Sequence, residues 1–114
     1  MTPILEIDVS TEFSPYPGGR MREDGKWTGQ AFREDILLPA LKKADRIVLI
    51  MNGALGYPTS FLEEAFGGLV RECHISGNEL LQRFEFRYRN EYTVEVIKSM
   101  IRDAASVAKQ PCNA

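Results

Sequence analysis

The sequence predicts an α/β domain in which helices pack on a small β-sheet that is largely parallel or mixed. Two observations lead to this prediction: short segments with strand character alternate with longer amphipathic segments, and one of the short segments, at 46–51, is almost continuously apolar. The chain has 114 residues, which is a usual length for one domain. We assign residues 3–108 to this single domain and residues 109–114 to a flexible C-terminal tail.

The first predicted strand covers residues 4–9, where apolar and polar side chains partly alternate. The next segment, 11–27, contains closely spaced prolines and glycines followed by a cluster of charged residues. This composition predicts a long exposed loop or a loose hairpin, and we expect it to be the most mobile internal segment of the chain. The side chains expected to anchor it to the core are Phe13, Tyr16 and Trp27.

An amphipathic helix is predicted at 28–44, with Thr28 as its cap. Pro39 interrupts the helical pattern and removes a backbone hydrogen bond to Asp35, so we expect a kink or a break there. The segment 46–51 that follows is rich in β-branched residues. Because strands of this kind are covered on both faces, we expect it at the centre of the sheet.

A second major helix is predicted at 60–72. Ser60 and Glu63 have the spacing of a capping box, in which the serine Oγ accepts a hydrogen bond from the Glu63 N–H. Gly67 and Gly68 lie in the middle of this helix, where each glycine costs roughly 1 kcal/mol relative to alanine. That cost indicates that something packs closely against the two glycines.

The last third of the chain again contains a capping-box spacing, an alternating segment and an amphipathic segment. Ser76 and Glu79 again have capping-box spacing and predict a short helix. The alternating residues that follow predict a strand at 84–89 with one solvated face. A final amphipathic helix is predicted at 91–108.

Composition excludes several classes of function. The formal net charge of −2 lacks the basic surplus of a nucleic-acid binder. No apolar run approaches the roughly 18–20 residues that span a bilayer, and Glu6 and Asp8 lie where a signal peptide would be uncharged. Cys73 and Cys112 do not form a disulfide framework, which indicates a reducing, cytoplasmic setting. The single histidine, His74, adjoins Cys73 in a spacing that suits a metal poorly, so we predict no metal and no cofactor.

A first candidate binding segment lies within 17–22. Backbone N–H groups and guanidinium groups there could bind an anion, and the residues concerned are Gly18, Gly19, Arg20 and Arg22. The alternative interpretation is a plain loop whose glycines supply positive φ angles.

A second candidate segment is the start of the helix at 60–72. Thr59 and Ser60 place two hydroxyls where the helix dipole and free N–H groups favour a phosphate, so both are candidate phospho-acceptors. The alternative is that Ser60 only caps the helix and Thr59 only forms the turn before it.

Three stretches resemble the bacterial family described as a STAS-like domain of unknown function: FSPYPGGR at 13–20, GQAFR at 29–33 and LGYPTSFLEEAFGGLVR at 55–71. The part from Ser60 to Arg71 is the most specific. This family is distantly related to the STAS domains of anti-sigma-factor antagonists and of sulfate-transporter tails. The resemblance implies a small sheet with helices stacked on it, in agreement with the order of elements above.

The resemblance also implies a regulatory mechanism. In the antagonists, a hydroxyl at a helix start is phosphorylated by a partner kinase with a histidine-kinase-type ATPase fold, and phosphorylation releases that partner. Thr59 falls on the phospho-acceptor position and Ser60 on its neighbour. This chain has Pro58 and Phe61 where the antagonists have Asp and Gly.

We therefore predict a non-enzymatic regulatory module that binds a protein partner, with a histidine-kinase-type ATPase as the implied partner. The expected contact surface includes Tyr57, Phe61 and Glu64. One alternative is a sensor of a small anionic ligand or nucleotide that uses the 17–22 segment and the helix start. Another is an enzyme, against which the single histidine and the lack of an acid–base pair argue. The oligomeric state stays open.

Overall fold

The sheet of the computed structural model consists of three parallel strands in the order β1-β2-β3. Their bounds are β1 (Ile4–Asp8), β2 (Arg46–Ile50) and β3 (Phe84–Arg87). The structure describes residues 3–109, so the predicted tail, with Cys112, lies outside the described residues except for Lys109. The parallel sheet and its helices confirm the predicted α/β class, and β2 has the predicted central position.

Helices make up most of the rest of the described chain, and two long helical stretches dominate it. The first stretch consists of α2 (Gly29–Phe32), a π-helical segment η2 (Arg33–Leu37) and α3 (Leu38–Lys43). The second consists of α4 (Thr59–Leu62), a π-helical segment η3 (Glu63–Gly67) and α5 (Gly68–Arg71). The remaining helices are α1 (Val9–Glu12), a 3-10 turn η1 (Arg22–Asp24), α6 (Gly77–Arg83) and α7 (Glu91–Lys109).

The predicted break at Pro39 does not occur, because helical backbone runs without interruption from α2 to α3. The helix instead widens just before the proline. The Leu38 N–H donates to the carbonyl of Arg33, five residues back, in the bond that defines a π-turn. Pro39, which has no N–H to donate, follows directly after this wider turn.

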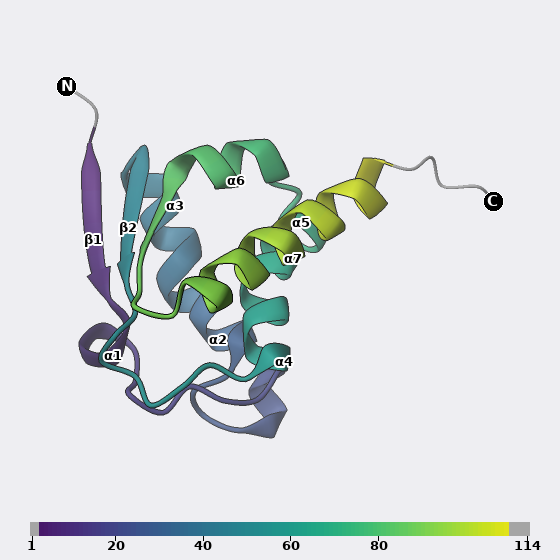
Figure 1. Ribbon diagram of the computed structural model, residues 1–114. Coiled ribbons are helices and arrows are strands. Elements are labelled where there is room, and N and C mark those ends of the chain that lie inside the picture. Colours follow the sequence, from purple (N-terminus) through teal and green to yellow (C-terminus); the bar gives the residue numbers. More distant parts are fainter. Residues whose placement is uncertain (1–2, 110–114) are drawn as a thin grey trace.

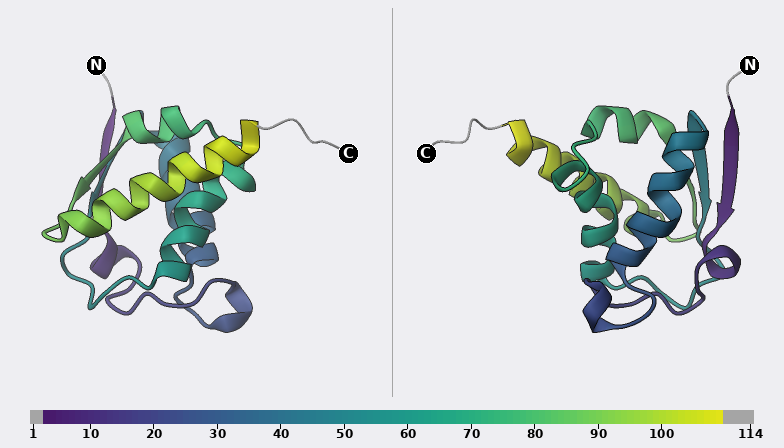
Figure 2. Two further views of the ribbon diagram at one scale, coloured as in Figure 1. Left: turned by 45° about the vertical axis from the view of Figure 1, so that its right-hand side comes forward. Right: turned by 180° about the vertical axis from the view of Figure 1, so that it is seen from behind.

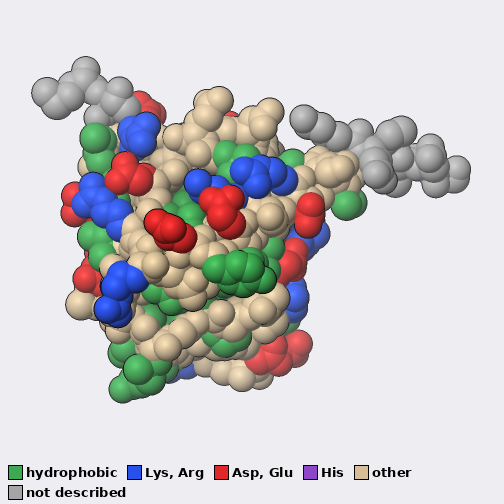
Figure 3. All heavy atoms as spheres, in the orientation of Figure 1, with side chains coloured by type: hydrophobic (Ala, Val, Ile, Leu, Met, Phe, Trp, Pro, Cys, Tyr) green, Lys and Arg blue, Asp and Glu red, His purple; other side chains and the backbone are tan. Residues whose placement is uncertain are grey.

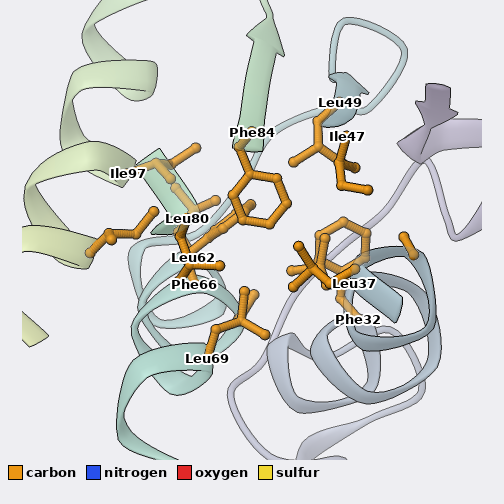
Figure 4. Close-up of a cluster of buried hydrophobic side chains, with 14 of the residues drawn as sticks. Phe32, Leu37, Ile47, Leu49, Leu62, Phe66, Leu69, Leu80, Phe84 and Ile97 are labelled. Atoms are coloured by element: carbon orange, nitrogen blue, oxygen red, sulfur yellow. The ribbon is translucent and has the colours of Figure 1, made fainter. Parts of the chain in front are cut away.

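All the long helices lie on one side of the sheet (Figures 1 and 2). On that face Ile47 and Leu49 of β2 are 0% exposed, with Phe84 and Phe86 of β3 beside them. Apolar side chains from the sheet and the helices meet in one core (Figure 4), which includes Phe32, Leu37, Leu62, Phe66, Leu69, Leu80 and Ile97. Within residues 3–109, no helix has the length and apolar character needed to cross a bilayer.

No helical layer formed by residues 3–109 covers the opposite face of the sheet (Figures 1 and 2). Val48, which points to that face, is nevertheless only 3% exposed, because charged side chains on the neighbouring strands surround it. Arg46 pairs with Glu85 at 3.6 Å, and Arg87 pairs with Glu85 at 3.0 Å and with Glu6 at 3.8 Å. Charged side chains of both signs follow this flank in Figure 3. The expectation that β2 is buried on both faces is therefore correct, but aliphatic stems of ionic side chains form the second layer.

Candidate functional site

The second helical stretch begins at the surface without a side-chain cap. Pro58 is its N-cap residue, with extended backbone at ψ 148°, and its carbonyl accepts a hydrogen bond from the Leu62 N–H at 3.1 Å. Ser60 is thus already inside the helix, so the prediction that Ser60 caps it is wrong. With Pro58 at the N-cap, Ser60 is the second helical residue and does not occupy the capping position. Thr59 is exposed, as predicted, whereas Ser60 is half-buried.

Large apolar side chains are exposed around Pro58, the residue that precedes Thr59. Leu55 is 82% exposed and Tyr16 is 65% exposed, so the prediction that Tyr16 anchors its loop to the core is wrong. These residues line a shallow groove together with Pro58, and the Leu55 N–H donates to the Pro15 carbonyl at 2.9 Å to join the two loops that form it. We call Tyr16, Leu55, Pro58 and Thr59 the helix-start surface. Exposed apolar clusters of this kind are typical of surfaces that contact other molecules.

Tyr57 lies beneath this surface and is half-buried. Its hydroxyl donates to the Met51 carbonyl at 2.8 Å, and its ring contacts Tyr88 edge to face with centroids 5.5 Å apart. Burial raises the pKa of the Tyr57 hydroxyl, which is neutral at physiological pH. The residue therefore supports the loop between β2 and α4 while presenting part of its ring to the groove.

Phe61 and Glu64 do not lie on the surface, so the expectation that they form a contact surface with Tyr57 is wrong. Phe61 is 0% exposed and packs against Phe32, with ring centroids 5.6 Å apart. Glu64 is 6% exposed and pairs with a buried arginine of the first helical stretch. Both side chains face α2, because that turn of the helix packs directly against the start of the first stretch.

A network of charged side chains joins the two helical stretches, and sequence analysis did not predict it. The Arg33 guanidinium donates from Nη1 to the Glu64 carboxylate at 2.6 Å and to the Glu64 carbonyl at 2.7 Å. Arg20 donates to Glu63 at 2.6 Å and to Glu64 at 3.1 Å, and Arg71 also bonds Glu63. Burial acts to raise the pKa of Glu63, but the bonds from Arg71 and Arg20 outweigh it and the pKa is lower than usual.

Gly67 and Gly68 allow this network to form, which confirms the predicted close packing. A Cβ atom on Gly68 would overlap the Arg33 guanidinium, and one on Gly67 would overlap the Glu63 carboxylate. The glycine pair was thus the signal in the sequence that a side chain crosses the helix here. The identity of that side chain could not be inferred, because Arg33 lies in a different helix.

The proposed anion-binding loop has its guanidinium groups already paired. Arg20 contacts Glu63 and Glu64 as above, and Arg22 donates to Glu34 at 3.0 Å and to Asp35 at 2.8 Å. Gly19 has φ +88°, and the Gly18 N–H donates to the Trp27 carbonyl at 2.8 Å. The glycines therefore shape the loop, in line with the alternative interpretation.

Of the three predicted anchors of the segment 11–27, Phe13 packs against the core. Phe13 contacts Phe32 with ring centroids 5.0 Å apart, which confirms Phe13 as an anchor, whereas Trp27 is 37% exposed and packs on Phe13, with centroids 5.4 Å apart, rather than on the core itself.

Cys73 and His74 follow the end of α5. His74 has φ +59°, in the left-handed region, and burial raises the pKa of the Cys73 thiol. Among residues 3–109, no group of three or more His, Cys, Asp or Glu side chains is arranged to hold a metal ion.

The family model described as a STAS-like domain of unknown function matches residues 28–93 of this chain. The chain belongs to this family. The matched region of the STAS-like domain begins at the cap of α2 and ends inside α7, so it includes Thr59 and every member of the charged network except Arg20. No curated protein and no solved structure matches the chain.

Proposed function

We propose that this STAS-like domain is a non-enzymatic regulatory module that binds a protein partner through the helix-start surface. One observation carries the proposal: an uncapped helix start presents an exposed hydroxyl, Thr59, directly after Pro58, which lines a groove together with the exposed side chains of Tyr16 and Leu55. A protein surface that combines apolar area with a modifiable hydroxyl suits binding that can be switched.

The relation of the family to STAS domains of anti-sigma-factor antagonists supports a specific partner, an ATPase of the histidine-kinase type. It also supports Thr59 as the residue that this partner phosphorylates. Of the two candidate hydroxyls, Thr59 is the exposed one and Ser60 is half-buried, so a kinase reaches Thr59 more easily.

The electrostatics at this position favour a phosphate on Thr59. The first N–H groups of α4 receive no side-chain cap within the described residues, so the positive end of the helix dipole is open there. A phosphate would add a charge of about −1.5 to −2 at that end. Repulsion from Glu63, one turn further on, is reduced because Arg71 and Arg20 already compensate its carboxylate.

The alternative of an anion or nucleotide sensor has no comparable support. Its candidate guanidinium groups, on Arg20 and Arg22, are occupied by carboxylates of the same chain. An anion would have to displace those carboxylates before it could bind.

The test compares Thr59→Glu with Thr59→Ala, and uses Ser99→Glu as a matched control at an exposed hydroxyl on α7. Each tagged variant is incubated with extract of cells that make the protein, and the captured ATPase is quantified alongside the melting temperature. We expect the Thr59→Glu variant alone to lose capture, with its melting temperature unchanged or slightly raised. Equal capture by the wild type and all three variants would contradict the proposal.

A further inference from the structure

We infer that the 18–27 loop opens and closes against the two helical stretches as a unit, while the rest of the fold stays intact. The ion pairs of Arg20 and Arg22 hold the closed form. The inference is independent of the proposed function, because it concerns only how this loop is attached.

The loop has few buried groups to hold it in place. Its ends are joined by the hydrogen bond from the Gly18 N–H to the Trp27 carbonyl, which makes it an Ω-loop. The flanking residues Pro17 and Thr28 are buried, but no side chain from 18 to 26 is buried. A Cβ atom on Gly18 or Gly25 would meet no neighbouring atom within 4 Å. The one ring-to-ring contact of the described loop residues is made by Trp27 at its end, whose ring packs edge to face on Phe13, so hydrophobic burial contributes little to the position of residues 18–26.

Ion pairs supply most of the side-chain contacts that remain. Arg20 is 39% exposed and its partner Glu63 is 30% exposed. Arg22 is 46% exposed and pairs with Glu34 and Asp35, which are 39% and 59% exposed. Pairs at this exposure are weak and are screened by salt. The contact between Arg20 and the buried Glu64 is the least accessible to screening.

The loop also completes the hydrogen bonding at the start of α2. The carbonyls of Gly19 and Arg20 accept hydrogen bonds from the N–H groups of Gly29 and Gln30, each at 3.0 Å. The Arg22 N–H donates to the Gln30 side chain at 2.9 Å. When the loop opens, these first N–H groups of the helix lose their acceptors, so their exchange with solvent reports opening directly.

Opening changes the charged network on one side of the loop. It removes Arg20 from Glu64, so the pair that Glu64 forms with Arg33 is exposed to water. On the other side the loop adjoins Pro17, a buried residue that also lines the groove at the helix start. The loop thus lies between the charged network and that groove.

The experiment is residue-resolved amide hydrogen exchange by NMR, at low salt and at about 1 M NaCl, where the Debye length is about 3 Å. The variant is Arg20→Gln, and the matched control is Lys42→Gln, an exposed cation on α3 without an ion pair among residues 3–109. We expect Gly29 and Gln30 in the wild type to exchange faster than Val48 and Leu49 of β2. Arg20→Gln and high salt should each accelerate Gly29 and Gln30 by about fivefold, with β2 and the Lys42→Gln control unchanged.

Two results would overturn the inference. One is exchange of Gly29 and Gln30 at the rate of β2 in the wild type, which would mean that the loop opens only when the whole domain unfolds. The other is an absence of salt-dependent acceleration in the wild type. That measurement uses no variant, so it decides the matter even if Arg20→Gln weakens the whole fold and accelerates β2 as well.

Discussion

The two helical stretches, α2 to α3 and α4 to α5, share a design and differ at their starts. Each begins at or beside a threonine and passes through a π-helical segment. Thr28 is 0% exposed and its hydroxyl accepts a hydrogen bond from the Ala31 N–H at 3.2 Å. The two N–H groups before Ala31 donate to carbonyls of the 18–27 loop. Thr59 is exposed and its helix start is uncapped. The start of the first helical stretch thus stabilises the fold, whereas the start of the second remains available for binding.

The largest effect is expected where the two stretches are joined. Glu64→Gln removes the buried countercharge of Arg33, which is 4% exposed and whose Nε has no partner among the described residues, and leaves it only the more distant Glu34 at 3.7 Å. Leaving that charge buried should lower the free energy of unfolding by about 3–5 kcal/mol, measured by urea denaturation.

Glu85→Gln is the matched control for this prediction. Glu85 forms ion pairs on the open face of the sheet, where its side chain is 41% exposed. Its loss should change the free energy of unfolding by less than about 1 kcal/mol. Similar losses in the two variants would show that the Arg33–Glu64 pair does not join the stretches as described.

A pair of threonine substitutions tests the difference between the two starts. Thr28→Ala removes a buried cap and should cost about 1–2 kcal/mol of stability. Thr59→Ala removes an exposed hydroxyl without a capping role and should stay within about 0.5 kcal/mol of the wild type. Thermal or urea denaturation of both variants measures the difference, and equal losses would refute the distinction between the starts.

The sequence predicted the N-caps of two helices correctly and that of a third helix wrongly, and the error has a local cause. Thr28 caps α2 as expected, and Ser76 caps α6, with its Oγ 3.4 Å from the Glu79 N–H. Ser60 has the same spacing to its glutamate as Ser76, so the spacing alone could not separate them. In the second stretch the first helical hydrogen bond runs to the Pro58 carbonyl, so the N-cap lies two residues before Ser60.

The charged interior could not be predicted from the helical pattern. A glutamate inside a helix is expected on the solvated face, and Glu64 is buried only because Arg33 from another helix neutralises it. Similarly, β2 was expected to be covered on both faces, but the pattern could not show that the second cover is ionic. Local periodicity predicted the elements and the central strand, whereas contacts between distant charges required the structure.

The C-terminal ends of the two helical stretches provide a further comparison, with a smaller expected effect on stability. The second stretch ends with His74 in the left-handed conformation, where its N–H donates to the Val70 carbonyl at 3.1 Å and the Ile75 N–H donates to the Leu69 carbonyl at 3.1 Å. The bond from the His74 N–H to the Val70 carbonyl is that of an αL cap, which favours glycine at the left-handed position. His74→Gly should therefore raise stability by about 1 kcal/mol, seen as a higher melting temperature.

Ala44→Gly is the control for the other end. The first stretch ends at Ala44 with φ −140°, an extended conformation that needs no glycine. This substitution should lower the melting temperature, because it removes a buried methyl group and loosens the unfolded chain. A gain in stability from glycine at both ends would contradict the account of the His74 turn.

Site-specific photo-crosslinking tests most directly whether the second helix start is a binding surface. A photoreactive amino acid replaces Leu55 in the helix-start surface or, as a control, the exposed Lys42 on α3, in cells that make the protein. Mass spectrometry then identifies the crosslinked proteins. We predict that position 55 crosslinks an ATPase of the histidine-kinase type, that position 42 does not, and that Thr59→Glu weakens the crosslink. Crosslinking of the same protein at both positions, or of none at position 55, would contradict the central claim.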